Sequence, residues 1–123
     1  LHEDATVPVS KVADMLVRVQ EIAREHGVLI ATFGHAGDGN LHPVILFDER
    51  DPDEARRAME AAEAIFKAAL ALGGTLTGEH GIGLSKARFF ALEHGPVELK
   101  VLKAIKAALD PNGILNPGKI WGD

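Results

Sequence analysis

The feature that most constrains this chain is an Asp38-Gly39 pair between two apolar segments, residues 28–33 and 41–47. Both segments are rich in β-branched and aromatic residues, so they are predicted to be β-strands. An Asp-Gly pair between two strands is a strong hairpin signal, because a type I′ turn needs positive φ angles at both central residues. The sequence therefore predicts two antiparallel strands joined at Asp38 and Gly39.

Counting outward from this turn predicts which side chains face each other. A two-residue turn and a symmetric four-residue loop both place His35 directly opposite His42. Directly opposed residues of an antiparallel pair share a face, with Cβ atoms roughly 5 Å apart. We therefore expect two imidazole rings side by side near the end of the hairpin.

The rest of the chain supplies two helices and two further strands around this hairpin. Residues 4–7 and 75–77 have the composition of short strands. Apolar residues recur at helical spacing over residues 10–26 and 52–72, the second segment starting at Asp51 as its N-cap. The order β-α-β-β-α-β is that of the ferredoxin-like, split βαβ fold, in which two helices pack on one face of an antiparallel sheet. We predict an α+β fold of this kind.

Beyond residue 77 the chain is predicted to continue as C-terminal helices and an extended tail. A short helix is expected over residues 84–93, broken at Gly95, and a longer one over residues 96–109. The longer helix is expected to bury four apolar side chains: Leu99, Leu102, Ile105 and Leu109. Residues 114–121 are predicted to be extended. At this length, residues 1–123 are expected to form a single domain.

Composition argues against several classes of function. The formal net charge is −5 and no basic cluster occurs, which argues against nucleic acid as a partner. The chain has no cysteine, so a metal site would have to use histidine, carboxylate or carbonyl ligands. No segment reaches the ~18 apolar residues of a membrane span, and no signal peptide is recognised, so a cytoplasmic location is predicted. Because the sequence does not begin with methionine, we expect a fragment or a processed chain.

Three of the six histidines are candidate site residues. His35 and His42 are a natural pair of metal ligands, because imidazole nitrogens bind zinc and similar ions. Glu79 follows the last predicted strand in a glycine-rich turn and is the best candidate for a third ligand. His80, with glycines around it, suits a general base that works near neutral pH. The alternatives are a histidine pair that is hydrogen-bonded without a metal, and a His80 that caps the following helix.

The remaining histidines and two nearby cations are expected to be structural. His26 and His94 each precede a glycine at a helix end, where an imidazole can bond free carbonyl groups. His2 lies near the terminus and carries no functional indication. Lys86 and Arg88 are candidates for binding a substrate carboxylate, but a solvent-exposed helix face is the expected role.

Three segments, residues 33–43, 77–83 and 110–119, together resemble one known family. They are similar to the C-terminal domain of the FAD-linked oxidases of the vanillyl-alcohol-oxidase type. Within that family the resemblance is to the D subunit of glycolate oxidase and to the D-lactate and D-2-hydroxyglutarate dehydrogenases. It covers nearly the whole chain, and three motifs in the same order make it specific.

The resemblance implies a flavoenzyme that oxidises a 2-hydroxy acid to a 2-keto acid. Positions matching His35, His42 and Glu79 bind a divalent metal in these relatives, commonly zinc, which holds the carboxylate and hydroxyl of the substrate. The position matching His80 acts as a base on the hydroxyl. The position matching Asn116 lies close to the flavin and the substrate.

Two departures from the family pattern qualify what the resemblance implies. Val44 stands where the hydroxyglutarate relatives have an asparagine that touches the substrate, so a small acid such as glycolate or lactate is expected. The N-terminal FAD-binding domain of the family is absent from this chain, so the chain alone is expected to bind FAD poorly and to be inactive.

The expected partners follow from that absence. They are the FAD-binding domain of the same parent chain, other glycolate oxidase subunits and, through the apolar surface left uncovered, a second copy of this chain. Two other functions stay open at this point: a free-standing metal-dependent hydrolase and a ferredoxin-like ligand-sensing module.

Overall fold

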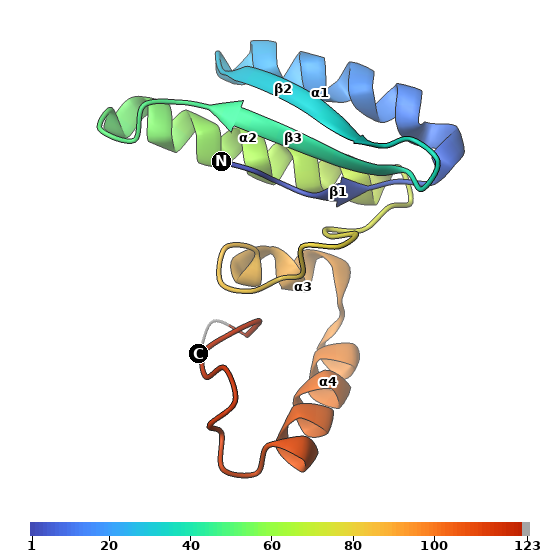
Figure 1. The fold of residues 1–123 in the computed structure, drawn as a ribbon, viewed down its shortest axis with the longest axis vertical. Coiled ribbons are helices and arrows are strands. Elements are labelled where there is room, and N and C mark those ends of the chain that lie inside the picture. The colour runs from blue at the N-terminus through green and yellow to red at the C-terminus, as the bar shows by residue number, and fades with distance from the viewer. Residues whose placement is uncertain (122–123) are drawn as a thin grey trace. The chain divides into compact units, whose positions relative to one another are not determined.

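A computed structural model describes residues 1–121 of the chain (Figure 1). Two compact units can be distinguished, Leu1–His80 and the part of the chain from Gly81 onward. Among the described residues, no helix has both the length and the apolar character needed to cross a membrane.

The first unit is an antiparallel sheet with two long helices on one of its faces (Figure 1). Its elements are β1 (Ala5–Thr6), a 3-10 turn η1 (Val9–Lys11), α1 (Val12–His26), β2 (Leu29–His35), β3 (Asn40–Leu46) and α2 (Pro52–Ala71). The strand order is β1-β3-β2. Beyond β1, Thr75 forms a single antiparallel bridge with Thr6, so the predicted fourth strand is reduced to one bridge. The α+β prediction is confirmed.

The hairpin forms as predicted, but its register differs from the predicted one. His35 lies opposite Asn40, and Phe33 lies opposite His42. The prediction of a direct His35–His42 pair is therefore wrong by two residues. A shift of two residues keeps every side chain on its predicted face, because the side-chain period of a strand is two. His35 and His42 thus still share the face of the sheet, as diagonal neighbours.

The cause of this register is a four-residue turn over residues 36–39. The amides of Asp38 and Gly39 both donate to the carbonyl of His35, at 2.9 and 3.0 Å. Gly39 has a φ of 75° and lies against the segment after β1, where its carbonyl accepts a hydrogen bond from the amide of Val7 at 3.0 Å. A contact with a distant segment therefore decides the turn, and local Asp-Gly chemistry alone does not.

The core of the first unit lies between the sheet and the two helices. Five of the largest fully buried side chains come from the two helices and β3: Met15, Ile22, Ile45, Ile65 and Phe66. The predicted start of α2 is confirmed: the Asp51 side chain accepts hydrogen bonds from the amides of Asp53 and Glu54, at 2.9 and 3.3 Å. This packing leaves the other face of the sheet open.

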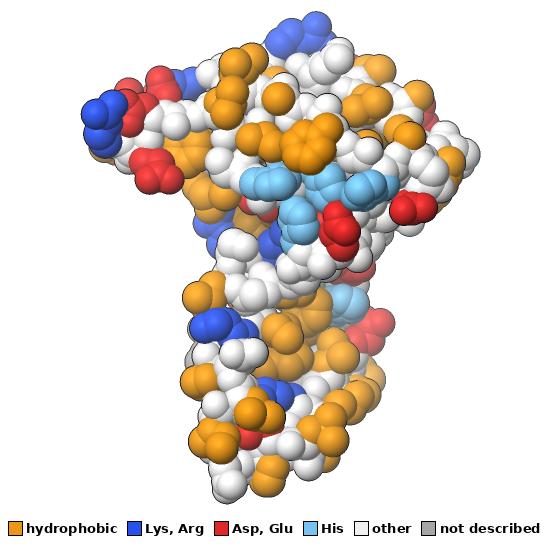
Figure 2. Space-filling model, viewed as in Figure 1, with side chains coloured by type: hydrophobic (Ala, Val, Ile, Leu, Met, Phe, Trp, Pro, Cys, Tyr) orange, Lys and Arg blue, Asp and Glu red, His pale blue; other side chains and the backbone are white. Residues whose placement is uncertain are grey.

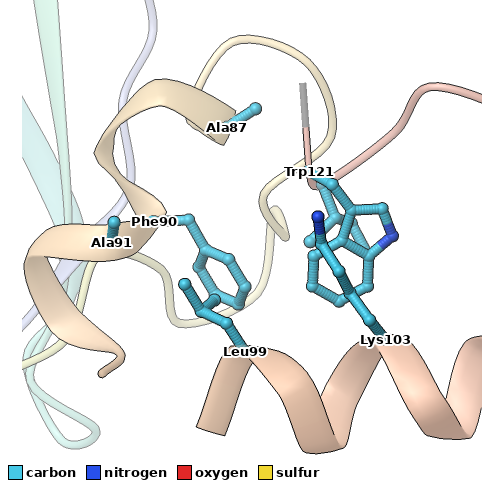
Figure 3. A pocket seen from close by; sticks show the side chains of 7 residues that line it. Ala87, Phe90, Ala91, Leu99, Lys103 and Trp121 are labelled. Atoms are coloured by element: carbon cyan, nitrogen blue, oxygen red, sulfur yellow. The ribbon is translucent and has the colours of Figure 1, made fainter. Parts of the chain in front are cut away.

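The second unit is a small helical one, made of η2 (Ala87–Phe89), α3 (Phe90–Glu93), α4 (Pro96–Leu109) and a tail without regular structure. Phe90, Leu99 and Trp121 face a small pocket within it (Figure 3). Leu99 and Leu102 are half-buried. The predicted burial of Ile105 and Leu109 is wrong, because these side chains are 53% and 77% exposed.

Two further predictions for this unit need correction. The predicted helix over residues 84–93 is shorter than expected, because only η2 and α3 are helical. Lys86 was expected on a solvent-exposed helix face, but it is buried, whereas Arg88 is exposed and lies over the ring of Phe89.

Candidate functional site

The open face of the sheet carries a cluster of imidazole rings with a carboxylate beside them (Figure 2). The Nε2 atom of His42 lies 3.0 Å from Oε1 of Glu79, and Nε2 of His35 lies 3.3 Å from the same oxygen. The rings of His35 and His42 are edge-on, with centroids 5.3 Å apart. The structure thus brings together the three residues that were predicted from the sequence to be metal ligands.

The three side chains differ in their access to solvent. The side chain of His42, in the middle strand β3, is 5% exposed, whereas those of His35 and Glu79 are 56% and 51% exposed. Phe33 lies directly opposite His42, and the centroids of the two rings are 5.4 Å apart. The site therefore has a buried, packed side at His42 and an open side at His35 and Glu79.

A buried carboxylate, that of Asp4, holds the segment that carries Glu79 and His80. The sequence did not predict Asp4 as a site residue. One oxygen of Asp4, Oδ2, accepts four hydrogen bonds at 2.6–3.0 Å, from the hydroxyl of Thr77 and the amides of Gly78, Glu79 and His80. Asp4 is fully buried. Hydrogen bonds to an ionised carboxylate are roughly twice as strong as neutral ones. Asp4 thus fixes the backbone from which both Glu79 and His80 project.

The same segment packs closely against the sheet at Gly78. A Cβ atom at this position would lie 2.3 Å from Oγ1 of Thr6 and 2.8 Å from the side chain of Asn40. The Thr6 hydroxyl itself donates to Oδ1 of Asn40 at 3.1 Å. An added Cβ atom would have to displace these side chains, so the glycine at position 78 keeps the segment that carries Glu79 close to the sheet.

His80 lies next to the three candidate ligands. Its ring stacks on that of His42, with centroids 5.0 Å apart and planes 12° apart. Its amide is held by Asp4, and the next helical element, η2, has Lys86 at its N-cap position and no side-chain cap. His80 therefore does not cap a helix, and the capping alternative is wrong.

The donor set of His35, His42 and Glu79 fits a divalent cation. Tetrahedral zinc with ligands at about 2.0–2.1 Å places its donor atoms roughly 3.3 Å apart, close to the two distances to Glu79. Two imidazoles and one carboxylate are also the ligands of many catalytic zinc sites that keep one position open. The same two distances suit hydrogen bonds from neutral imidazoles to a carboxylate, which is the metal-free alternative.

Comparison with known proteins decides the family. Residues 1–120 match the family described as FAD linked oxidases, C-terminal domain. This chain belongs to that family. As a C-terminal domain of this kind, it is similar to only part of longer proteins: the chain spans about a quarter of the length of the curated relatives that it matches.

Three relatives of this FAD linked oxidase domain show the range of named activities. The chain is 49% identical to the glycolate oxidase subunit GlcD of Bacillus subtilis, over 97% of this chain and 25% of that protein. It is 40% identical to a probable mitochondrial D-lactate dehydrogenase of Danio rerio, over 95% and 24%. It is 39% identical to a D-2-hydroxyglutarate dehydrogenase of Stutzerimonas stutzeri, over 96% and 26%.

A solved structure supports the fold of the domain. The 4-ethylphenol oxidase from Gulosibacter chungangensis matches 100% of this chain and 24% of its own length, with a TM-score of 0.66 and 23% identity. At this identity the likeness concerns the fold alone.

Two other histidines and Asn116 belong to other parts of the fold, whereas His2 lies at the cluster. His26 ends α1 with its Nδ1 3.9 Å from Glu60, and His94 follows α3 and packs on the ring of Phe90. Asn116 belongs to the tail of the second unit, with a φ of 47°. His2, which carried no signal in the sequence, does lie at the cluster, because its ring is edge-on to that of His80 at 5.1 Å.

Proposed function

We propose that this chain is the C-terminal part of an FAD-dependent 2-hydroxy-acid dehydrogenase of the glycolate or D-lactate type. The observation that carries the proposal is the convergence of His35, His42 and Glu79 on one point of the open sheet face, with His80 stacked beside them. The names of the relatives supply the reaction class. The complete enzyme would remove a hydride from C2 of the acid and a proton from its hydroxyl, which leaves a 2-keto acid.

His35, His42 and Glu79 would hold a divalent cation, with zinc the ion that suits two imidazoles and a carboxylate. Such a cation, when bound, lowers the pKa of a coordinated hydroxyl and orients the acid. Residues of the chain also orient the substrate. Glu79 and the two rings set the position of the acid, and the open side at His35 leaves room for it.

His80 is the proposed catalytic base. An imidazole titrates near neutral pH and can accept the hydroxyl proton on a ring nitrogen. The amide of His80 is fixed by Asp4 and its ring is supported by His42, so the ring has a defined place. Asp4 acts only through this backbone and is a positioning residue.

FAD is proposed to be held mainly by a separate domain of the same parent polypeptide, with Asn116 contributing a contact from this chain. When bound, the flavin accepts the hydride that the acid loses. Further partners proposed for the whole protein are other glycolate oxidase subunits, because one relative is named as a subunit. The predicted cytoplasmic location stays a prediction, since another relative is named as mitochondrial.

The substrate is proposed to be a small acid such as glycolate or lactate. Val44 lies on the same face of the sheet as His42 and is paired with Ala31 of β2. Phe33, two residues further along β2, lies on that face too. These side chains offer no hydrogen-bonding group to a second carboxylate. A second carboxylate lying on these side chains would therefore lose part of its hydration without a hydrogen bond from them, which costs free energy.

Flavin reduction in the complete polypeptide tests the proposal. With glycolate or D-lactate in stopped-flow, His80→Ala should slow flavin reduction by about 10²- to 10⁴-fold, the usual contribution of a general base. His26→Ala removes an imidazole outside the cluster and should not change the rate. If the flavin were reduced at the same rate in His80→Ala, His80 would not be the catalytic base. Metal-dependent ester or amide hydrolysis without flavin would favour the hydrolase alternative.

A further inference from the structure

A second set of three imidazoles lies beside the first candidate set. His2, His42 and His80 each place one ring nitrogen so that the three atoms lie within 4.8 Å of one another. The ring of His2 is edge-on to both others, with centroid distances of 5.1 Å to His80 and 5.7 Å to His42. The two sets have only His42 in common.

His2 is held in this place by the backbone on both sides of it. It forms an antiparallel bridge with Val44, so its side chain lies on the same face as His42. The amide of Glu3 donates to the carbonyl of Pro43 at 3.0 Å, and the amide of Ile45 donates to the carbonyl of Leu1 at 2.8 Å. His2 is therefore an ordered neighbour of β3.

The imidazoles of this set have unused hydrogen-bonding capacity. Within residues 1–121, the rings of His2 and His80 take part in ring contacts but in no hydrogen bond or ion pair. The Nδ1 atom of His42 is buried and has no hydrogen-bond partner among the described residues, although the residue is only 4% exposed. A buried polar atom without a partner costs about 1–3 kcal/mol. A ligand at this place would use ring nitrogens of His2 and His80, which form no hydrogen bond or ion pair among the described residues.

We propose that His2, His42 and His80 form a second site for a divalent transition-metal ion, which shares His42 with the set that contains Glu79 and is therefore an alternative to it. Three neutral imidazoles suit Zn²⁺, Ni²⁺ and Cu²⁺ and are poor ligands for Mg²⁺ or Ca²⁺. The set has no carboxylate, so it lacks the charge attraction that Glu79 gives to the first set. It therefore binds the ion more weakly, and the ring of His80 has to turn out of its stack on His42 so that its nitrogen points at the ion.

An ion at this second site has a consequence for the proposed reaction. It would occupy a ring nitrogen of His80, so His80 could no longer accept the proton of the substrate. Zinc bound at this second site therefore inhibits the complete enzyme. This consequence rests on the proposed role of His80, whereas the binding of the ion does not.

Zinc binding to the 123-residue chain tests the site without any activity measurement. In equilibrium dialysis with Zn²⁺ alone, Glu79→Gln, which disables the first set, should still bind one ion per chain. Adding His2→Ala to that variant should weaken this binding at least tenfold. Adding His26→Ala instead, which removes an imidazole outside both sets, should leave it unchanged. Circular dichroism of each variant checks that the fold is retained.

The outcomes separate this inference from the proposed function. Wild-type binding that is lost in Glu79→Gln and unaffected by His2→Ala would overturn the second site and support the first set. Binding that survives Glu79→Gln but needs His2 would support the second site, and it would do so even if His35 proved dispensable. Absence of Zn²⁺ binding to the wild-type chain would overturn both.

Discussion

At the scale of single residues, the site depends on a carboxylate that takes no part in the proposed chemistry. Asp4 is buried in the strand segment that opens the chain, and one of its oxygens accepts four hydrogen bonds from residues 77–80. A buried charge is tolerated only when it is paired or hydrogen-bonded. Residues 77–80 and Asp4 therefore stabilise each other, and the positions of Glu79 and His80 depend on both.

Replacing Asp4 by asparagine should destabilise the chain. The neutral amide accepts hydrogen bonds more weakly and adds donors that face other donors, so we expect a loss of about 2 kcal/mol or more in the free energy of unfolding. Urea unfolding followed by circular dichroism measures it. Asp14→Asn is the matched control, because Asp14 is exposed and its ion pair with Lys11 contributes less than about 1 kcal/mol. Equal effects of the two substitutions would contradict the role given to Asp4.

The residues of the site could be predicted in part from the sequence. Four site residues could be predicted because two motifs place them next to a turn and among glycines: His35, His42, Glu79 and His80. The structure brings the four together. Asp4 was missed because its partners are more than 70 positions away, and a single buried carboxylate in a strand has no local signal. His2 was missed for the same reason, since only the bridge to Val44 places it at the cluster.

At the scale of elements, the hairpin turn is decided by Gly39. Its φ of 75° lies in the left-handed region, and a Cβ atom there would lie 1.9 Å from the carbonyl oxygen of Val7. That contact with backbone cannot be relieved by a side-chain rotation. Gly37, in the same turn, has no atom within 4 Å of an added Cβ.

Gly39→Ala should therefore lower stability much more than Gly37→Ala does. The left-handed conformation alone costs about 1–2 kcal/mol for a residue with a Cβ atom, and the clash with Val7 adds to it. Gly37→Ala should change the free energy of unfolding by less than about 1 kcal/mol in either direction. Urea unfolding of the two variants makes the comparison. If both alanines proved equally tolerated, the turn would not be held by its contact with Val7.

The end of α4 depends on one ionised aspartate. Lys106 donates to the Asp110 carboxylate, as do the amides of Leu115 and Ile114, and these bonds hold the pKa of Asp110 below its usual value. A carboxyl whose pKa is lower in the folded chain adds stability above its unfolded pKa, about 3.9, and that stability is lost as the pH falls through the folded pKa.

The stability difference between the wild type and Asp110→Asn should therefore shrink as the pH is lowered from 6 toward 2. The single tryptophan, Trp121, lies in the same unit and reports its unfolding by fluorescence. A difference that stays constant over this range would show that the charge of Asp110 does not hold the tail.

At the scale of the whole molecule, the order of elements could be predicted because helical and strand periodicities are local. α1, α2 and the hairpin follow from such patterns, and the α+β class follows from their order. What could not be predicted depends on distant packing. The predicted fourth strand is reduced to the bridge at Thr75, and the hairpin register depends on the contact between Gly39 and Val7. Ile105 and Leu109 are exposed although their spacing is helical.

Ion binding should raise the stability of the chain, because an ion that binds only the folded state shifts the unfolding equilibrium. At a free Zn²⁺ concentration of 100 times its dissociation constant, the gain is about 2.7 kcal/mol. Urea unfolding with Zn²⁺ and with a chelator measures the difference. Equal stability under both conditions would mean that the folded chain has no preferred ion site.

The most direct test of the account is the position of the ion itself. Anomalous diffraction from crystals of the chain grown with one equivalent of Zn²⁺ should show its strongest peak about 2.0–2.2 Å from Nε2 of His35, Nε2 of His42 and an oxygen of Glu79. A strongest peak bound to other residues, or no peak at these three side chains, would contradict it.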